Sequence, residues 1–128
     1  MRALHPTRAP AAIGPYSQAA EAGGFLFSAG QIGLDPANGE FVGDDVETQA
    51  EQVCENIRAI LEKAGLSFGD VVKTTVYLAD MDEFPMVNAI YAKHFREPYP
   101  ARSTVAAAGL PLGARVVFDV IACRSTDR

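Results

Sequence analysis

The sequence lacks the short motifs that most directly indicate a cofactor or a metal ion. It contains no Gly-x-Gly-x-x-Gly, no phosphate-binding loop, no closely spaced cysteine pair and no His-x-x-x-His. These patterns bind dinucleotides, nucleotide phosphates or zinc. We therefore expect neither a metal nor a nucleotide cofactor.

Long apolar runs and clusters of basic residues are also missing. The longest uncharged stretches are broken by Gly or Pro well short of a membrane span, and residues 1–12 hold no apolar run of signal-peptide length. Eleven Lys and Arg stand against sixteen Asp and Glu, which gives a formal net charge of −5. This balance disfavours nucleic acid as a partner. We expect a cytoplasmic protein that binds neither nucleic acid nor membranes.

Cysteine is scarce, with two residues in a chain of 128. A chain of this length can bury roughly two thirds of its unfolded surface, so it needs no disulfide or structural metal. The composition fits one domain spanning residues 1–128. Cys54 falls among the apolar positions of an expected helix and Cys123 near the end of an expected strand. We interpret both as small buried hydrophobic side chains rather than as a reactive pair or a metal site.

The first third of the chain predicts a β-hairpin and then a loop. Residues 16–20 and 25–29 suit two short strands, and the glycine-containing segment 21–24 suits the turn between them. Residues 35–45 are dense in turn-forming residues, which predicts a loop with room for a brief strand.

An amphipathic helix is predicted to follow over residues 46–64. Apolar residues recur there at steps of three and four, and most charged residues fall between them. Asp44 and Asp45 can supply N-cap oxygens, and Gly65 stands where a left-handed C-terminal residue is favoured.

The rest of the chain predicts three strands and a second helix. Residues 71–78 are rich in β-branched and aromatic residues, and 102–107 and 116–123 also suit strands. A helix is expected to begin near Asp82 with Pro85 in its first turn. Its inner stripe would consist of Phe84, Val87, Tyr91 and Phe95. The predicted order is β-β-α-β-α-β-β, an α+β fold.

The last predicted strand carries apolar side chains on both faces. In residues 116–123, Val117 and Ile121 point to the side opposite Val116 and Phe118. Two helices can cover one face of the sheet, but no element of this chain is left to cover the other. We therefore expect a homo-oligomer, with the clefts between subunits as candidate ligand sites.

Arg102 is the strongest candidate for ligand binding. It opens a predicted strand directly after the rigid Pro98-Tyr99-Pro100 segment and shares a strand face with Thr104. A guanidinium held in this way suits a carboxylate. The alternative is a surface or interface arginine in a salt bridge, and Tyr16 could likewise serve only in packing. His5, His94 and the serines have no context that indicates a catalytic triad.

Four segments of the sequence resemble the reactive-intermediate deaminase family, also called the YjgF or RidA family. They are APAAIGPYSQA (9–19), SAGQIGLDPANGE (28–40), VVKTTVYLADMDEFPMVNAIYAKHF (71–95) and YPARSTVAAAGLP (99–111). Their most specific parts are IGPYSQ, SAGQI, Asn88-x-x-Tyr91 and PARST. The resemblance covers nearly the whole chain. It implies a chorismate-mutase-like fold with two helices on one face of a mixed sheet, assembled as a homotrimer with sites between subunits.

The resemblance also implies an activity, the hydrolysis of 2-imino acids or their enamine tautomers to 2-keto acids and ammonia without metal or organic cofactor. In that scheme Arg102 binds the substrate carboxylate and Tyr16 lines the cleft. The backbone N–H groups of Gly30 and Thr104 match donors that face the ligand. Many family members have cysteine at the position of Thr104, so a cysteine nucleophile is not implied here.

Two positions depart from family members that hydrolyse imines. Ala29 stands where they have serine, and Val117 stands where they have a glutamate proposed to orient the water. Asp119 lies on the same strand face as Val117. Two residues along a strand span roughly 7 Å, however, so Asp119 is too far away for a simple replacement. Two functions therefore stay open: a deaminase or divergent hydrolase of small imino or enamine carboxylates, and a non-catalytic trimer that binds small carboxylates.

Overall fold

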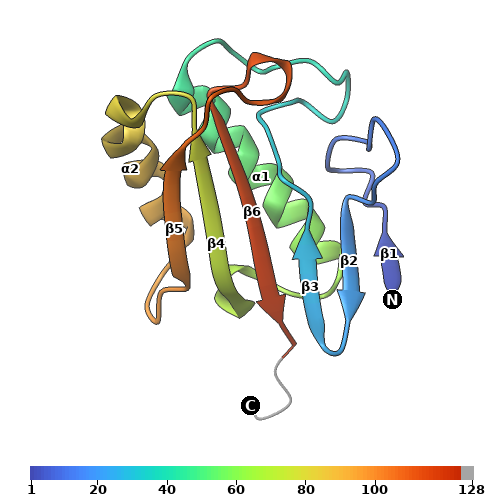
Figure 1. Ribbon diagram of the computed structural model, residues 1–128. Helices are drawn as coiled ribbons and strands as arrows, with labels where there is room; N and C mark the ends of the chain where they lie inside the picture. The colour runs from blue at the N-terminus through green and yellow to red at the C-terminus, as the bar shows by residue number, and fades with distance from the viewer. Residues whose placement is uncertain (125–128) are drawn as a thin grey trace.

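The structure, a computed structural model, describes residues 1–124 of the chain. It contains one six-stranded sheet in the order β1-β2-β3-β6-β4-β5, in which β4 and β5 run parallel and the other neighbouring strands run antiparallel. The helices α1 and α2 lie on one side of this sheet (Figure 1). The elements are β1 (Arg2–Leu4), β2 (Ala19–Ala22), β3 (Phe25–Ser28), α1 (Val46–Lys63), β4 (Val71–Leu78), α2 (Phe84–His94), β5 (Ala101–Ala106) and β6 (Val116–Cys123), with short 3-10 helices η1 (Phe68–Asp70), η2 (Met81–Glu83) and η3 (Pro111–Gly113). The predicted α+β class with two helices is confirmed.

Helix α1 begins and ends close to the predicted residues. The Asp45 carboxylate accepts a hydrogen bond from the Thr48 amide at 2.9 Å, which supplies the N-cap. Gly65 follows the helix with φ 74°, a conformation that residues with a Cβ avoid. The Asp45 cap and the left-handed Gly65 therefore define the two ends of the helix, Val46–Lys63.

The hairpin is present, but its first strand lies further along the chain than predicted. The turn consists of Gly23 and Gly24 alone, with φ 60° and 83°, so strand β2 extends to Ala22. Two consecutive positive φ values suit a two-residue turn of the type that matches strand twist. The predicted bounds of this strand, 16–20, are therefore wrong, and Tyr16 lies in the loop that precedes β2.

The N-terminus adds a strand that the predicted order omitted. Strand β1 pairs antiparallel with β2, and Arg2 forms an ion pair with Glu21 at 3.3 Å. The predicted order β-β-α-β-α-β-β is therefore wrong at its start. Three residues are too few to show a periodic pattern, and their pairing with residues 19–21 is visible only in the folded chain.

The later elements agree with the sequence. Strands β4 and β6 match the predicted ranges, and β5 matches within one residue. Residues Met81–Glu83 form the short helix η2, with an Asp80 oxygen accepting from the Asp82 amide, so α2 begins at Phe84. Of the predicted inner stripe, Val87 and Tyr91 of α2 are buried and Phe84 is half-buried, and the buried Phe95 follows the end of the helix.

The hydrophobic core lies between the helices and one face of the sheet. Strand β6 contributes Val116, Phe118, Val120 and Ala122 to it. The other face remains largely open in the single chain, where Phe25 and Phe27 are 41% and 45% exposed. Val117, on that open face, is nonetheless only 6% exposed. Among residues 1–124, the expectation that this face is uncovered therefore agrees with the exposure of β3 and is wrong for the start of β6.

The two cysteines differ in their surroundings. Cys54 on α1 is fully buried, and burial raises the pKa of its thiol far above the ordinary value. Cys123 at the end of β6 is only half-buried. The expectation of a buried thiol is thus confirmed for Cys54 alone. Within residues 1–124, no helix has the length and apolar character needed to cross a membrane.

Candidate functional site

A cavity of about 500 Å³ lies beside the start of β6. Four of the six predicted site residues line it: Tyr16, Ala29, Gly30 and Val117. The rest of its wall comes from the N-terminal loop, from residues 31–34 and from the loop before β6. The structure therefore brings together residues that are about 100 positions apart in the sequence.

Gly30 and Val117 lie close together in the lining of the cavity. Gln31 exchanges backbone hydrogen bonds of 2.8 and 3.2 Å with Phe118, which places Gly30 against Val117. A Cβ atom on residue 30 would lie 2.8 Å from Val117 Cγ1, closer than real contacts allow. Among the residues that the structure describes, the Gly30 amide has no hydrogen-bond acceptor. The Gly30 amide is thus available as a hydrogen-bond donor.

Tyr16 also lines the cavity and is 52% exposed. Its hydroxyl accepts a hydrogen bond from the Ile13 amide at 3.4 Å. Its ring therefore shapes the wall of the cavity.

Gln18 supports the same wall and was missed at the sequence level. It is 3% exposed, and its amide nitrogen lies 3.0, 3.2 and 2.6 Å from the carbonyl oxygens of Pro6, Ala9 and Pro10. These contacts fasten the N-terminal segment over the cavity. A glutamine inside the IGPYSQ motif was the available signal, because a buried amide needs backbone partners.

Arg102 lies elsewhere, on strand β5 beside helix α2. Its Nη1 donates to Asn88 Oδ1 at 2.8 Å, and its guanidinium stacks 4.7 Å from the ring centre of Tyr91 and 5.2 Å from that of Phe84. The Tyr91 hydroxyl is in turn hydrogen bonded to Thr74 at 2.9 Å. The motif Asn88-x-x-Tyr91 thus has a structural role, because both residues hold the arginine in place.

The Arg102 guanidinium has no carboxylate partner in the described part of the chain. The alternative of an intramolecular salt bridge is therefore not found among residues 1–124. A positioned cation without a counter-charge can still accept a carboxylate.

Thr104 lies two residues from Arg102 on the same edge strand. The Ala107 amide donates to the Leu78 carbonyl at 2.9 Å, and amides alternate between the two edges along a strand. The amide of Thr104 therefore points away from β4, towards the edge of the sheet that has no neighbouring strand among residues 1–124.

Arg102 and the cavity beside β6 do not meet within one chain. The hollow at Arg102 is lined by Asn88, Tyr91, Ala92, Tyr99 and Pro100, none of which lines the other cavity. The structure thus divides the predicted site into two surfaces. One contains Tyr16, Ala29, Gly30 and Val117, and the other contains Arg102 and Thr104.

Asp119 does not replace the missing glutamate at Val117. It does not line the cavity and instead lies opposite Thr75 on β4. Burial raises the pKa of its carboxyl group, and hydrogen bonds from Tyr77 and Thr75 partly offset that effect. The Asp119 charge is also the main reason why the pKa of Tyr77 is raised.

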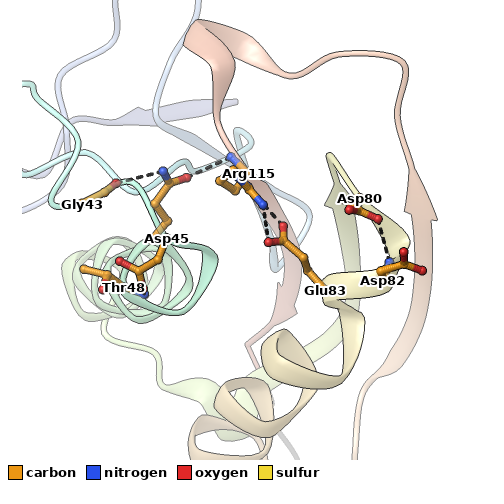
Figure 2. A network of polar contacts seen from close by, with 8 residues as sticks. Gly43, Asp45, Thr48, Asp80, Asp82, Glu83 and Arg115 are labelled. Carbon is orange, nitrogen blue, oxygen red and sulfur yellow. Dashed lines mark hydrogen bonds and ion pairs between the residues drawn. The ribbon is translucent and has the colours of Figure 1, made fainter.

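A polar network holds the chain just before β6 (Figure 2), next to the loop whose Pro111 and Leu112 line the cavity. Arg115 pairs with Glu83 through two nitrogens, one of them at 3.1 Å, and its amide donates to Gln49 at 2.9 Å. Gln49 then donates to the Gly43 carbonyl at 2.9 Å. These bonds tie the chain just before β6 to helix α1 and to η2.

Comparison with known proteins places this arrangement in a family. Residues 6–124 match the family described as endoribonuclease L-PSP. The chain belongs to that family, also called the YjgF or RidA family. A relative from Arabidopsis thaliana named Reactive Intermediate Deaminase A, chloroplastic, is 50% identical over 115 residues, which cover 90% of this chain and 62% of the relative.

Two further comparisons support the same assignment. The mouse 2-iminobutanoate/2-iminopropanoate deaminase is 46% identical over 121 residues, covering 94% of this chain and 90% of the relative. The crystal structure of E. coli TdcF with bound serine has a TM-score of 0.92 at 41% identity and covers 98% of this chain and 100% of its own. The YjgF/RidA family and these deaminase names point to chemistry on reactive imines.

Proposed function

We propose that this YjgF/RidA-family protein hydrolyses small 2-imino acids or their enamine tautomers to 2-keto acids and ammonia. In this proposal Arg102 holds the substrate carboxylate, and the reaction takes place in clefts between the subunits of a homotrimer. The observation that carries the proposal is the Arg102 guanidinium, which is held by Asn88 and Tyr91 and lacks an acidic partner among the described residues.

The division of the candidate site into two surfaces supports clefts between subunits. Arg102 and Thr104 lie on the edge strand β5, whereas Gly30 and Val117 lie beside β6. A second copy of the chain could bring its own cavity against the unpaired edge of β5. The exposed Phe25 and Phe27 on the open sheet face would be covered in the same assembly.

The chemistry required of the protein is modest. A fork-shaped guanidinium binds a carboxylate through two charge-assisted hydrogen bonds and fixes the adjacent imine carbon. Water adds its oxygen to that carbon, and the imine nitrogen takes up the proton as the C=N π bond opens. The resulting carbinolamine transfers its hydroxyl proton to nitrogen and expels ammonia, leaving the keto group. The free amides of Gly30 and Thr104 can stabilise oxygen as negative charge develops on it.

A non-catalytic trimer that binds small carboxylates is the second candidate. It is favoured by one observation, that the cavity presents methyl groups at Ala29 and Val117 where imine-hydrolysing members have polar groups. The bound serine in E. coli TdcF carries a carboxylate and suits either candidate.

The test generates the imine in place. An amino-acid oxidase with catalase converts alanine or 2-aminobutyrate to the imino acid, and release of the keto acid is followed with and without the protein. We expect faster release with the wild type. Arg102→Ala should lower the catalytic efficiency about 30- to 1000-fold, as expected for loss of a bidentate charged contact.

Two controls complete this experiment. Arg96→Ala removes another exposed arginine and should leave the rate unchanged. Circular dichroism and sedimentation of Arg102→Ala should match the wild type. An unfolded Arg102→Ala would show that this arginine is structural, and binding of keto acid without faster release would favour the non-catalytic trimer.

A further inference from the structure

The cavity beside β6 is lined by few polar side chains. Its lining contains no charged residue and only three polar side chains, Tyr16, Gln18 and Gln31. The Gln18 amide nitrogen is taken up by three backbone carbonyls, and the Tyr16 hydroxyl meets the Ile13 amide. The Gln31 amide nitrogen lies 3.5 Å from the Ala29 carbonyl. The surface left for a ligand is therefore mainly aliphatic.

The lining also includes two large apolar side chains that are exposed in the single chain. Ile13 is 74% exposed and Leu112 is 68% exposed, and both belong to the lining. Leu112 also has φ 56°, in the left-handed region that residues with a Cβ rarely adopt. Exposed apolar side chains that gather around one hollow mark a ligand site more often than a random surface.

The size of the cavity exceeds what the smallest imino acids need. Its volume of about 500 Å³ lies within the range of pockets that hold drug-sized ligands, about 300–1000 Å³. A three-carbon substrate held by its carboxylate would leave most of that space empty or filled with water beside methyl groups. A substrate side chain that displaces this water gains affinity in proportion to the apolar area it buries.

Resting on the function proposed above, we propose that this cavity binds the side chain of the substrate and selects a large apolar one, branched aliphatic or aromatic. The floor is formed by Gly30 and Val117, where the tight contact leaves no room for a polar group on residue 30. Ile13 and Leu112 close over the end of the substrate side chain. Polar side chains are disfavoured because the proposed reaction uses the Gly30 amide for the reacting oxygen and the lining side chains offer few other hydrogen-bond partners. One-carbon side chains are disfavoured because they leave the apolar wall wet.

The experiment compares substrates that differ only in their side chain. Imino acids are generated by oxidase from alanine, leucine, phenylalanine and serine, and each rate is divided by the uncatalysed hydrolysis of the same imine. We expect the leucine- and phenylalanine-derived imines to exceed the alanine-derived one by about tenfold or more in catalytic efficiency, and the serine-derived one to be slowest. Calorimetric binding of pyruvate, 4-methyl-2-oxopentanoate and phenylpyruvate is measured in parallel.

Two variants test Ile13 and Leu112 against a matched control. Leu112→Asn keeps a residue that tolerates positive φ, and Ile13→Thr keeps a β-branched side chain. Each should reduce the preference for the leucine-derived over the alanine-derived imine about three- to tenfold. Val72→Thr makes the same kind of change at an exposed residue outside the cavity and should leave the preference unchanged.

The outcomes separate this inference from the proposed function. Catalysis with no preference, or with alanine-derived imine preferred, would overturn the inference and leave the deaminase intact. Selective binding of the larger keto acids without catalysis would support the inference and contradict the deaminase. Absence of both catalysis and keto-acid binding would overturn both.

Discussion

Gly30 and Val117 constrain each other at the residue scale. Because a Cβ on residue 30 would lie 2.8 Å from Val117 Cγ1, Gly30→Ala should force one of them to move. We expect a loss of about 1–3 kcal/mol in the free energy of unfolding, the usual effect of overpacking. Urea unfolding of the wild type, Gly30→Ala, Val117→Ala and the double variant measures the coupling. Additive effects of the two changes would show that the contact does not limit residue 30.

Val117 stands where the sequence resemblance implies a glutamate that orients the water. If it replaces the residue that positions water, the wild type should hydrolyse short imino acids slowly and Val117→Glu should accelerate them. In the proposed mechanism Arg102 still holds the substrate, so the gain should appear mainly in kcat, where general-base assistance is worth about 10²- to 10⁴-fold.

The new carboxylate would itself be buried, and its desolvation should lower stability by several kcal/mol in the absence of a donor. Adding Ala29→Ser can supply that donor. Val117→Gln is the matched control, since it adds a similar side chain without a base. If the wild type is already fast and Val117→Glu is neutral or harmful, another group positions the water.

At the scale of elements, helix α1 depends on its N-cap in a way that pH can reveal. Hydrogen bonds from Thr48 lower the pKa of the Asp45 carboxyl group below its ordinary value. Its charged form is therefore favoured in the folded chain. The stabilisation is present above the pKa that Asp45 has in the unfolded chain and is lost as pH falls through the lower pKa of the folded chain.

Thermal unfolding of the wild type and Asp45→Ala at neutral and acidic pH checks this expectation. The variant should be less stable at pH 7, and the difference should narrow as the pH falls towards 3 and below. Asp45→Asn keeps an acceptor without the charge, so it should show less of this pH dependence. A difference that stays constant with pH would contradict a role for the charge.

At the scale of the whole molecule, the open sheet face leads to an expected assembly. Sedimentation at micromolar concentration should give about three times the chain mass of 13.6 kDa. Phe27→Asp should weaken the assembly, because it places a charge on a 45% exposed apolar position of that face. Val42→Asp changes an exposed apolar loop residue and should leave the mass unchanged. A stable wild-type monomer would contradict both the trimer and the clefts.

The local elements followed from short stretches of sequence. Residues 46–63 carry their own periodicity and cap, and β4 and β6 carry β-branched runs, so each was predicted nearly to its ends. The hairpin was predicted, but the bounds of its first strand were wrong. Both a turn over 21–24 and a turn of Gly23 and Gly24 alone fit the sequence. Strand β1 was missed because its three residues form a strand only by pairing with β2, and they carry no pattern of their own.

The sequence by itself determined the class of fold, the helices and the types of residue available for binding a carboxylate, since these depend on periodicity, caps and side-chain chemistry within short segments. Tertiary structure decided which of these residues meet. In the folded chain Gly30 lies against Val117. Asn88 and Tyr91 contact Arg102 and hold it away from the cavity that Gly30 and Val117 line. These relations depend on how strands distant in the sequence pair and on which face each side chain occupies. A segment read alone does not contain that information, because the contacts arise only when the sheet has formed.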